Sequence, residues 1–468
     1  MAVSKNTIIV IAAVAVVAVV AVAAFVVMNN GGGSGGSDAG ARVGEVIAEK
    51  NFPDTSSRLW VYGNANEDDF IDEDDISALE NMIKGSVKQT QLADANVDGK
   101  VDQADVDYLK NIINATSSTK IDVYYIDNYF KIAKVSWPVK TIATSYCSGL
   151  YTAEATGLTE KLIMVDDTIA TYWAKLNSYA AKATSFGSTE TPNYDLLIKS
   201  KVDVYVPGYC DAKADVESPK KLNPVGTDVM FMNTCDNSGV DYTNEYIDRS
   251  IVMFGYLLQG DLEKTYQYLL WHDYIIAAVE EAADKIAEED KGALIMSRNS
   301  PSYIETGEYS ITGKGNTNMI HADWAGCYVV GDHNSKLPKN YNTLKMEDIY
   351  TILKETNDGG HTTVYWIDNE HDGLRGQRDL DVTVAAWADA LDTAAPTMHY
   401  LGMAREAGNS PLYVLEMVFY MNVMHPGAID LDFEDCFYEF IDHFTLETEK
   451  YYAEMDIDNF FKDFGVLN

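Results

Sequence analysis

A long helical pattern in the middle of the chain constrains the fold more than any other feature. Apolar residues recur at helical spacing through residues 245–258 and again through 261–289. Gly260 is placed to end the first helix, and Asp261 is placed to cap the second. At 1.5 Å per residue the second helix would be about 43 Å long, enough to pass along two lobes. We therefore predict two folded halves joined by one long, rigid helix.

On both sides of this helix, short β-rich runs alternate with longer helical patterns. The candidate strands are 141–144, 162–165, 202–206 and 229–232 before it, and 293–296, 328–330 and 364–367 after it. Such alternation is typical of βαβ units and parallel sheets. The fold class is therefore α/β, with two Rossmann-like lobes. We expect an N-terminal lobe at 120–245, linking helices at 246–290 and a C-terminal lobe at 291–468.

The loops that follow these strands are the expected ligand site, because parallel sheets bind ligands at the carboxyl ends of their strands. The candidate ligand-binding residues are Tyr146, Tyr151, Tyr209, Arg298, Arg375 and Arg378. Tyrosine rings can stack on a large ligand or ligate iron, and guanidinium groups can hold carboxylates or phosphates. Two plainer interpretations stay open, because the chain contains 30 tyrosines and each arginine could form a solvated salt bridge.

The N-terminal 28 residues predict the location of the protein. Residues 8–28 carry no charge and are long enough to cross a hydrocarbon core of about 30 Å. Lys5 precedes them, which places the rest of the chain outside the membrane. We expect a single-pass anchor in the cell membrane with extracellular domains, and a flexible Gly/Ser-rich linker at 29–57. The alternative is a signal peptide cleaved near Ala23 and Ala24, which would release the protein.

Two acidic loops follow this linker, in the same register and 30 residues apart. Oxygen-bearing side chains occupy loop positions 1, 3, 5, 9 and 12 in both. They are Asn64, Asn66, Asp68, Asp72 and Asp75 in the first loop, and Asp94, Asn96, Asp98, Asp102 and Asp105 in the second. This spacing surrounds a calcium ion with hard oxygen ligands. Gly99 stands at position 6 of the second loop, where a sharp turn is needed, whereas the first loop has Asp69 there.

The segment 58–116 resembles a type I dockerin, because both loops end in aspartate and each precedes a short amphipathic helix. The resemblance implies a small all-α pair of EF-hand-like loops with calcium as cofactor. It also implies a cohesin-bearing surface protein as partner. A calcium-stabilised spacer with no such partner is the alternative.

The charge of the chain excludes some partners. Its 72 acidic and 35 basic side chains give a net charge of -37. Nucleic acid would be repelled, so none is expected as a partner.

The five cysteines form no CxxC pair, and residues 120–245 contain no histidine. The missing CxxC pair disfavours a zinc ribbon, and the missing histidines disfavour direct capture of bare zinc by the N-terminal lobe.

Four fragments resemble the iron-siderophore, haem and cobalamin binding proteins of ABC importers, the TroA-like class III binding proteins. Residues 140–167 read KTIATSYCSGLYTAEATGLTEKLIMVDD, and residues 193–206 read NYDLLIKSKVDVYV. Residues 344–367 repeat the second element, and residues 411–426, PLYVLEMVFYMNVMHP, look like the closing helix of that family. The resemblance spans 120–445. It implies a protein that binds a solute between its lobes without catalysing a reaction.

The expected function is therefore capture of a metal complex and its delivery to the permease of an ABC importer. A ferric siderophore, haem and a corrinoid all remain open as the ligand. Two alternatives are a dockerin-tethered surface enzyme and a scaffold or adhesion protein. The chain has no GxSxG, HExxH or P-loop motif, although acidic residues for glycoside hydrolysis are abundant.

Overall fold

The computed structural model describes residues 57–208, 212–232, 234–235, 243–298, 306–371, 380–391 and 396–466. The chain divides into two compact units. Residues up to Pro138 form the first unit together with Tyr266–Tyr274, and Val139–Thr265 form the second together with Ile275–Asn468. Among the described residues, no helix is both long and apolar enough to cross a membrane. The proposed membrane-spanning segment 8–28 lies outside them.

Two similar helices form the core of the first unit. Helices α2 (Glu73–Ile83) and α3 (Gln103–Ile113) each begin with a capping box, made by Asp72 and Asp102. Their apolar faces pack together, because each helix turns its buried residues toward the other. The shared core consists of Ala65, Ile76, Leu79, Met82, Ala93, Ala95, Val106 and Leu109.

An antiparallel hairpin completes the first unit. Strands β1 (Ile121–Ile126) and β2 (Ile132–Trp137) pair along their whole length. The hairpin also pairs with the chain before the first acidic loop, since the Tyr62 N–H donates to the Tyr124 carbonyl at 2.9 Å. The N-terminal lobe was expected to begin at residue 120. The hairpin instead belongs to the first unit, because this pairing ties it to residues 60–62.

The first lobe of the second unit contains a five-stranded sheet that is parallel throughout. Its strands lie in the order β5-β4-β3-β6-β7. They are β3 (Ile142–Thr144), β4 (Leu162–Val165), β5 (Thr184–Ser185), β6 (Val204–Val206) and β7 (Asp228–Val229). The chain moves outward from β3 in one direction and then in the other, as in doubly wound sheets. Helices α4 (Tyr146–Ala155), α6 (Tyr194–Ser200) and α7 (Ala212–Leu222) connect the strands.

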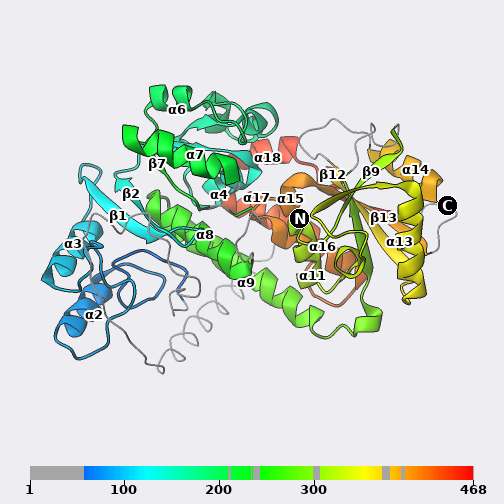
Figure 1. The fold of residues 1–468 in the computed structure, drawn as a ribbon, viewed down its shortest axis with the longest axis horizontal. Helices are drawn as coiled ribbons and strands as arrows, with labels where there is room; N and C mark the ends of the chain where they lie inside the picture. Colours follow the sequence, from blue (N-terminus) through cyan, green and yellow to red (C-terminus); the bar gives the residue numbers. More distant parts are fainter. Residues whose placement is uncertain are drawn as a thin grey trace. The chain divides into compact units, whose positions relative to one another are not determined.

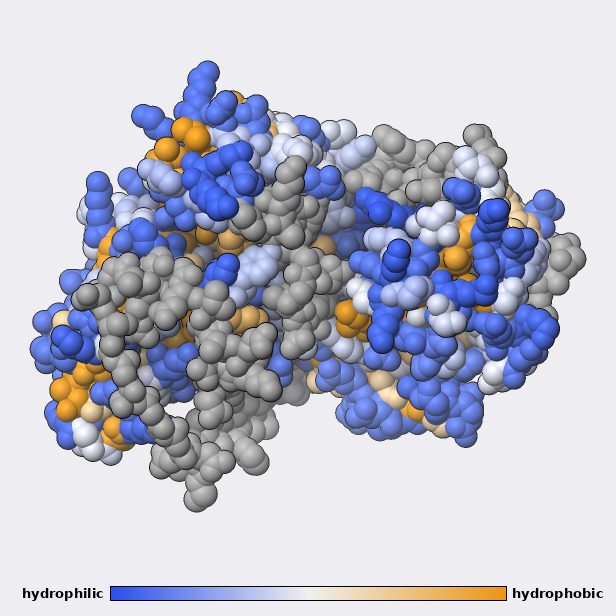
Figure 2. Space-filling view, viewed as in Figure 1, coloured by the Kyte–Doolittle hydropathy of each residue, from blue (hydrophilic) through white to orange (hydrophobic). Residues whose placement is uncertain are grey.

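The second lobe contains a mixed seven-stranded sheet. Its main path is β11-β9-β8-β12-β13-β14, and β10 pairs with β8. The strands are β8 (Ala293–Ser297), β9 (Glu308–Thr312), β10 (Tyr328–Val329), β11 (Tyr341–Lys345), β12 (Thr363–His371), β13 (Thr397–Ala404) and β14 (Phe461–Gly465). Helices α13 (Met346–Asp358) and α14 (Leu380–Leu391) pack on this sheet around Trp366 and Trp387 (Figure 1). Over α13 the visible surface is largely hydrophilic (Figure 2).

Helices α8 (Asn244–Leu257) and α9 (Leu262–Ala283) lie between the two sheets in the sequence, and Asp261 caps α9 as predicted. With 22 residues, α9 is about 33 Å long and ends six residues before the predicted end at 289. The remaining helices of the second lobe are α11 (Thr317–Trp324), α12 (Val330–His333), α15 (Arg405–Gly408), α16 (Tyr413–Met424), α17 (Phe433–Phe444), α18 (Thr448–Glu454) and α19 (Ile457–Phe460). Between α17 and α18 the chain returns to the first lobe, where the Leu446 N–H donates to Glu154 at 2.8 Å.

Candidate ligand-binding cleft

A polar cleft of about 450 Å³ lies in the second unit, lined from both lobes. Most of the lining residues follow strands of the two sheets, whereas Asn340 and Tyr341 lie at the start of β11. The lining residues are Tyr146, Thr168, Ser188, Thr189, Glu190 and Cys235 from the first lobe, and Arg298, Asn316, Thr317, Asn340, Tyr341, Arg405 and Asn409 from the second. This size is within the range of small-molecule sites, and the position is the one that parallel sheets use for ligands.

Asp166 organises the wall formed by the first lobe. It follows β4 and is fully buried. Its carboxylate accepts from the N–H of Tyr146 at 3.2 Å and of Ile169 at 2.9 Å, and from the hydroxyl of Thr189 at 2.9 Å. Burial raises the pKa of Asp166 above its usual value, although these donors oppose the shift. One carboxylate therefore connects the loops that follow three neighbouring strands.

Tyr146 begins α4 in an unusual backbone conformation, with φ of +63°. A bulky residue rarely adopts this left-handed conformation, so the turn is strained. The bond to Asp166 holds the turn, and the Tyr146 ring meets Trp173 edge to face with centroids 5.8 Å apart. The first lobe thus fixes an aromatic ring at the cleft.

The second lobe supplies two arginines. Arg298 follows β8 directly, and its guanidinium lies over the Tyr341 ring, 5.1 Å from the centroid. Arg405 is the first residue after β13. Between these arginines in the sequence, the Asn316 side chain caps α11 and donates to the Asn340 side chain at 2.6 Å. The cleft thus contains two arginines and one carboxylate, Glu190, and the arginines can pair with negatively charged groups of a ligand.

Three contacts join the lobes next to the cleft, one of them fully buried. The Trp173 indole N–H donates to Glu406 Oε1 at 2.6 Å, and both residues are fully buried. Cys147 donates to the Asn409 carbonyl at 3.3 Å, and Cys235 contacts the Asn409 side-chain oxygen at 3.6 Å. These contacts hold residues 405–409, which carry Arg405 and Asn409, against the first lobe.

The structure brings together only part of the ligand site expected from the sequence. Tyr146 and Arg298 line the cleft. Tyr151 does not, because it lies one and a half turns into α4, is 0% exposed, and packs its ring edge to face on Phe440. Tyr209, Arg375 and Arg378 lie outside the described residues. A direct role of Tyr146 and Arg298 in ligand binding stays a prediction.

Sequence reasoning missed Arg405, Asn409, Tyr341 and the Asn316 cap. The missing signal for Arg405 and Asn409 was β13, the run TMHYLGMA at 397–404, which ends immediately before Arg405. Tyr341 begins β11, an antiparallel edge strand with little apolar character. Recognition of these two strands would have identified the loops concerned.

The acidic loops in the first unit share the backbone conformation at position 4 and the contacts of their last carboxylate. Position 4 has φ of +57° in both, at Glu67 and Val97. In the second loop Asp105 is fully buried and accepts from the N–H of Asn96 at 3.2 Å and of Asp102 at 2.9 Å. Burial raises the pKa of Asp105 to about 6, and the nearby Asp94 and Asp98 add to this shift.

The first loop repeats this arrangement around Asp75. Asp75 is fully buried, accepts from the N–H of Asn66 at 3.1 Å and of Asp72 at 2.9 Å, and has a pKa raised by burial to about 7. Asn64 is also fully buried, and its Oδ1 atom has no hydrogen-bond partner among the described residues. A buried carboxylate and an unsatisfied amide oxygen in the same loop fit a hard cation. The dockerin resemblance itself stays a prediction.

No protein-family model and no curated protein matches the chain. Solved structures do match it. The TroA-like periplasmic binding protein FepB from Veillonella parvula has a TM-score of 0.53 at 14% identity, over 69% of this chain and 96% of that chain. Helicobacter pylori CeuE, in a nickel-histidine complex, has a TM-score of 0.52 at 14% identity, over 72% of this chain and 100% of that chain. Molybdate-bound MolA from Haemophilus influenzae has a TM-score of 0.52 at 12% identity, over 69% of this chain and 97% of that chain.

At these identities the likeness shows the fold. The chain has the mixed α/β fold of TroA-like periplasmic binding proteins, as the fragments at 140–167 and 193–206 predicted. The predicted location, a single-pass protein of the cell membrane with extracellular domains, is wrong. No described helix can cross a membrane, and the matching structures are of periplasmic proteins. The apolar segment that suggested an anchor lies outside the described residues.

Proposed function

We propose that this chain is the solute-binding protein of an ABC importer and holds its ligand in the cleft of the second unit. The cleft carries this proposal, since it is lined from both lobes and most of its lining residues follow strand ends. Proteins of the same fold include MolA of Haemophilus influenzae, the periplasmic molybdate-binding protein of an ABC transporter. The ligand would bind without covalent chemistry, and the loaded protein would meet the permease of the importer.

The ligand class is a metal complex with negatively charged groups. Arg298 and Arg405 can pair with carboxylate or phenolate oxygens, and the rings of Tyr146 and Tyr341 can contact a flat chelate. Asparagine, serine and threonine side chains make up most of the remaining lining. A polar lining suits a ferric siderophore better than haem or a corrinoid, because both of these expose large apolar surfaces. We therefore favour a ferric siderophore.

The test is a fluorescence titration of the full chain with ferric catecholate, hydroxamate and carboxylate siderophores, haem, cobalamin and molybdate, with free zinc as control. Trp173 touches the Tyr146 ring, so occupancy of the cleft should change tryptophan emission. We expect one class of ferric siderophore to bind at micromolar or lower concentration. Arg405→Ala should weaken binding at least about ten-fold, as loss of a charge-assisted bond does. The control Arg58→Ala changes an arginine of the first unit and should leave the affinity unchanged.

If the wild-type chain binds none of the compounds in the panel, the solute-binding proposal is contradicted. Binding of haem or cobalamin with no effect of Arg405→Ala would retain the transport role and overturn the choice of an anionic complex. Molybdate binding would place the ligand among simple oxoanions.

We also propose that the two acidic loops hold calcium. Support comes from the paired register of the loops, the buried Asp75 and Asp105 carboxylates, and the unsatisfied Asn64 Oδ1 atom. Asn64, Asp68 and Asp75 would be ligands in the first loop, and Asp94, Asp98 and Asp105 in the second. The ions would neutralise carboxylates that are otherwise buried beside one another. Calorimetric titration should give two calcium ions per chain. A cohesin-bearing partner stays a prediction, to be tested by adding a cohesin domain.

A further inference from the structure

The first acidic loop differs from the second at position 6. Gly99 occupies it in the second loop with φ of +90°, the conformation of the sharp turn. The first loop has Asp69 there, and Asp69 is not among the described non-glycine residues with positive φ. The first loop therefore makes this turn differently, and another contact must hold it.

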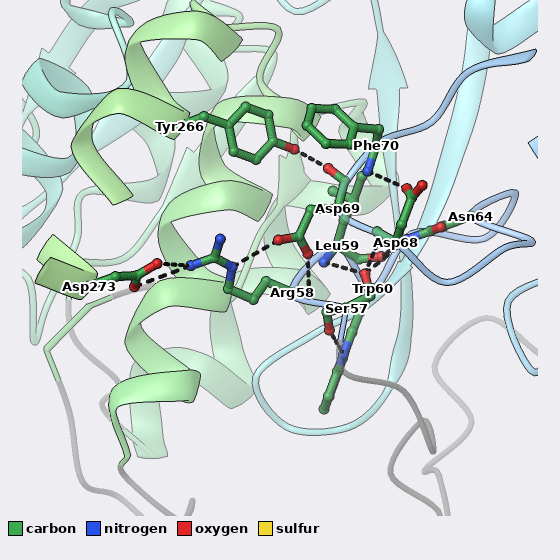
Figure 3. Close-up of polar contacts among 10 residues, drawn as sticks. All are labelled: Ser57, Arg58, Leu59, Trp60, Asn64, Asp68, Asp69, Phe70, Tyr266 and Asp273. Atoms are coloured by element: carbon green, nitrogen blue, oxygen red, sulfur yellow. Dashed lines mark hydrogen bonds and ion pairs between the residues drawn. The ribbon is translucent and has the colours of Figure 1, made fainter. Parts of the chain in front are cut away.

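Arg58 and α9 provide that contact (Figure 3). The Asp69 carboxylate accepts from the backbone N–H of Arg58 at 2.7 Å and from its Nε at 3.0 Å. The same guanidinium continues to Asp273 on α9, with Nη1 3.0 Å from Oδ2. Arg58 thus bridges two carboxylates, one from the loop and one from the helix.

A second contact reaches the backbone of the loop. The Tyr266 hydroxyl, also on α9, donates to the Asp69 carbonyl oxygen. The Tyr266 ring packs on Phe70 with centroids 4.9 Å apart. Figure 3 shows Tyr266 contacting the loop directly, whereas Asp273 is connected to it through Arg58. All these residues belong to the first unit, because this unit includes Tyr266–Tyr274.

Asp69, which Arg58 and Tyr266 hold in place, lies between two calcium-ligand positions. Asp68 stands at position 5, and Phe70 at position 7 would offer its backbone carbonyl. The contacts with α9 therefore fix the backbone on which both ligands depend. Ordering a loop costs entropy, and two interactions that need the same ordered form share this cost. Such coupling is reciprocal.

We propose that calcium binding in the first loop and docking of this loop on residues 266–274 of α9 strengthen each other. This inference rests on the proposed calcium sites, but it adds a partner for the first loop alone. In this proposal Asp69 replaces glycine at position 6 because its carboxylate binds Arg58 and its carbonyl oxygen accepts from Tyr266. The second loop, with Gly99, serves as an internal reference.

The test is calorimetric calcium titration of the full chain and of Tyr266→Phe and Asp273→Asn. Asp68→Asn and Asp98→Asn assign the two sites to the first and second loop. We expect each α9 variant to weaken the first site about five-fold or more, within the usual range of coupling, and to leave the second site unchanged. Tyr274→Phe is the matched control, because Tyr274 lies on the same helical segment and is 41% exposed.

Amide hydrogen exchange over residues 266–274 measures the reverse effect. Calcium should slow exchange there in the wild-type chain but not in Asp68→Asn. Two calcium ions bound with unchanged affinities in both α9 variants would overturn the linkage and leave the calcium proposal intact. A wild-type chain that binds no calcium would overturn both. Unchanged melting of the variants in chelator shows that they remain folded.

Discussion

Asp166 shows how one buried residue can shape the cleft. It connects the loops after β3, β4 and β5 through Tyr146, Ile169 and Thr189. Tyr146 needs such support, since its left-handed backbone conformation is unfavourable for a tyrosine. The position of an aromatic ring at the ligand site therefore depends on a carboxylate that lies behind it.

The raised pKa of Asp166 makes its contribution to stability depend on pH. The folded chain keeps the proton at pH values where the unfolded chain, with a pKa near 3.8, has lost it. Stability due to this proton is present at low pH and is lost as pH rises through the folded pKa. We expect the unfolding free energy of wild type to fall relative to that of Asp166→Asn as the pH rises above about 4 and passes through the folded pKa of Asp166. Urea unfolding across this range measures it, and a constant difference would contradict the assignment.

The contact between η3 (Ile169–Trp173) and α15 is a fully buried polar link between the lobes beside the cleft. Trp173→Phe removes the indole donor from Glu406. We expect a loss of about 1–3 kcal/mol in unfolding free energy and weaker ligand binding, because Arg405 shares α15 with Glu406. Glu406→Gln keeps an acceptor oxygen and should cost less. Equal melting points and equal ligand affinity in Trp173→Phe and wild type would show that the link carries little energy.

The strands that could be predicted from the sequence were those with a clear local pattern of apolar residues. The parallel strands at 141–144, 162–165 and 364–367 were found because they are short apolar runs between helices, and they became β3, β4 and β12. Strands β9, β11 and β14 were missed, because each pairs antiparallel with a distant partner and carries polar residues. Two cleft residues, Tyr341 and Asn340, were lost with β11.

At the scale of the molecule, the sequence predicted two lobes and a long helix between them, but not how the chain divides. The acidic loops signalled a separate module through their spacing alone. Nothing local indicated that the hairpin β1-β2 and residues 266–274 join this module, because both associations depend on long-range contacts of Tyr62 and Arg58. The return of the chain to Glu154 after α17 was missed for the same reason.

The shared helix leads to a prediction about the whole chain. Residues 266–274 of α9 belong to the first unit, while both ends of the same helix belong to the second. Removal of calcium with a chelator should lower the melting transition of the first unit most, because it leaves buried Asp75 and Asp105 without a cation. The second unit should respond less, only through the continuity of α9. Differential scanning calorimetry with and without chelator can separate the two transitions. Equal shifts would mean that the units unfold together, and a second transition that does not move at all would mean that α9 transmits nothing between them.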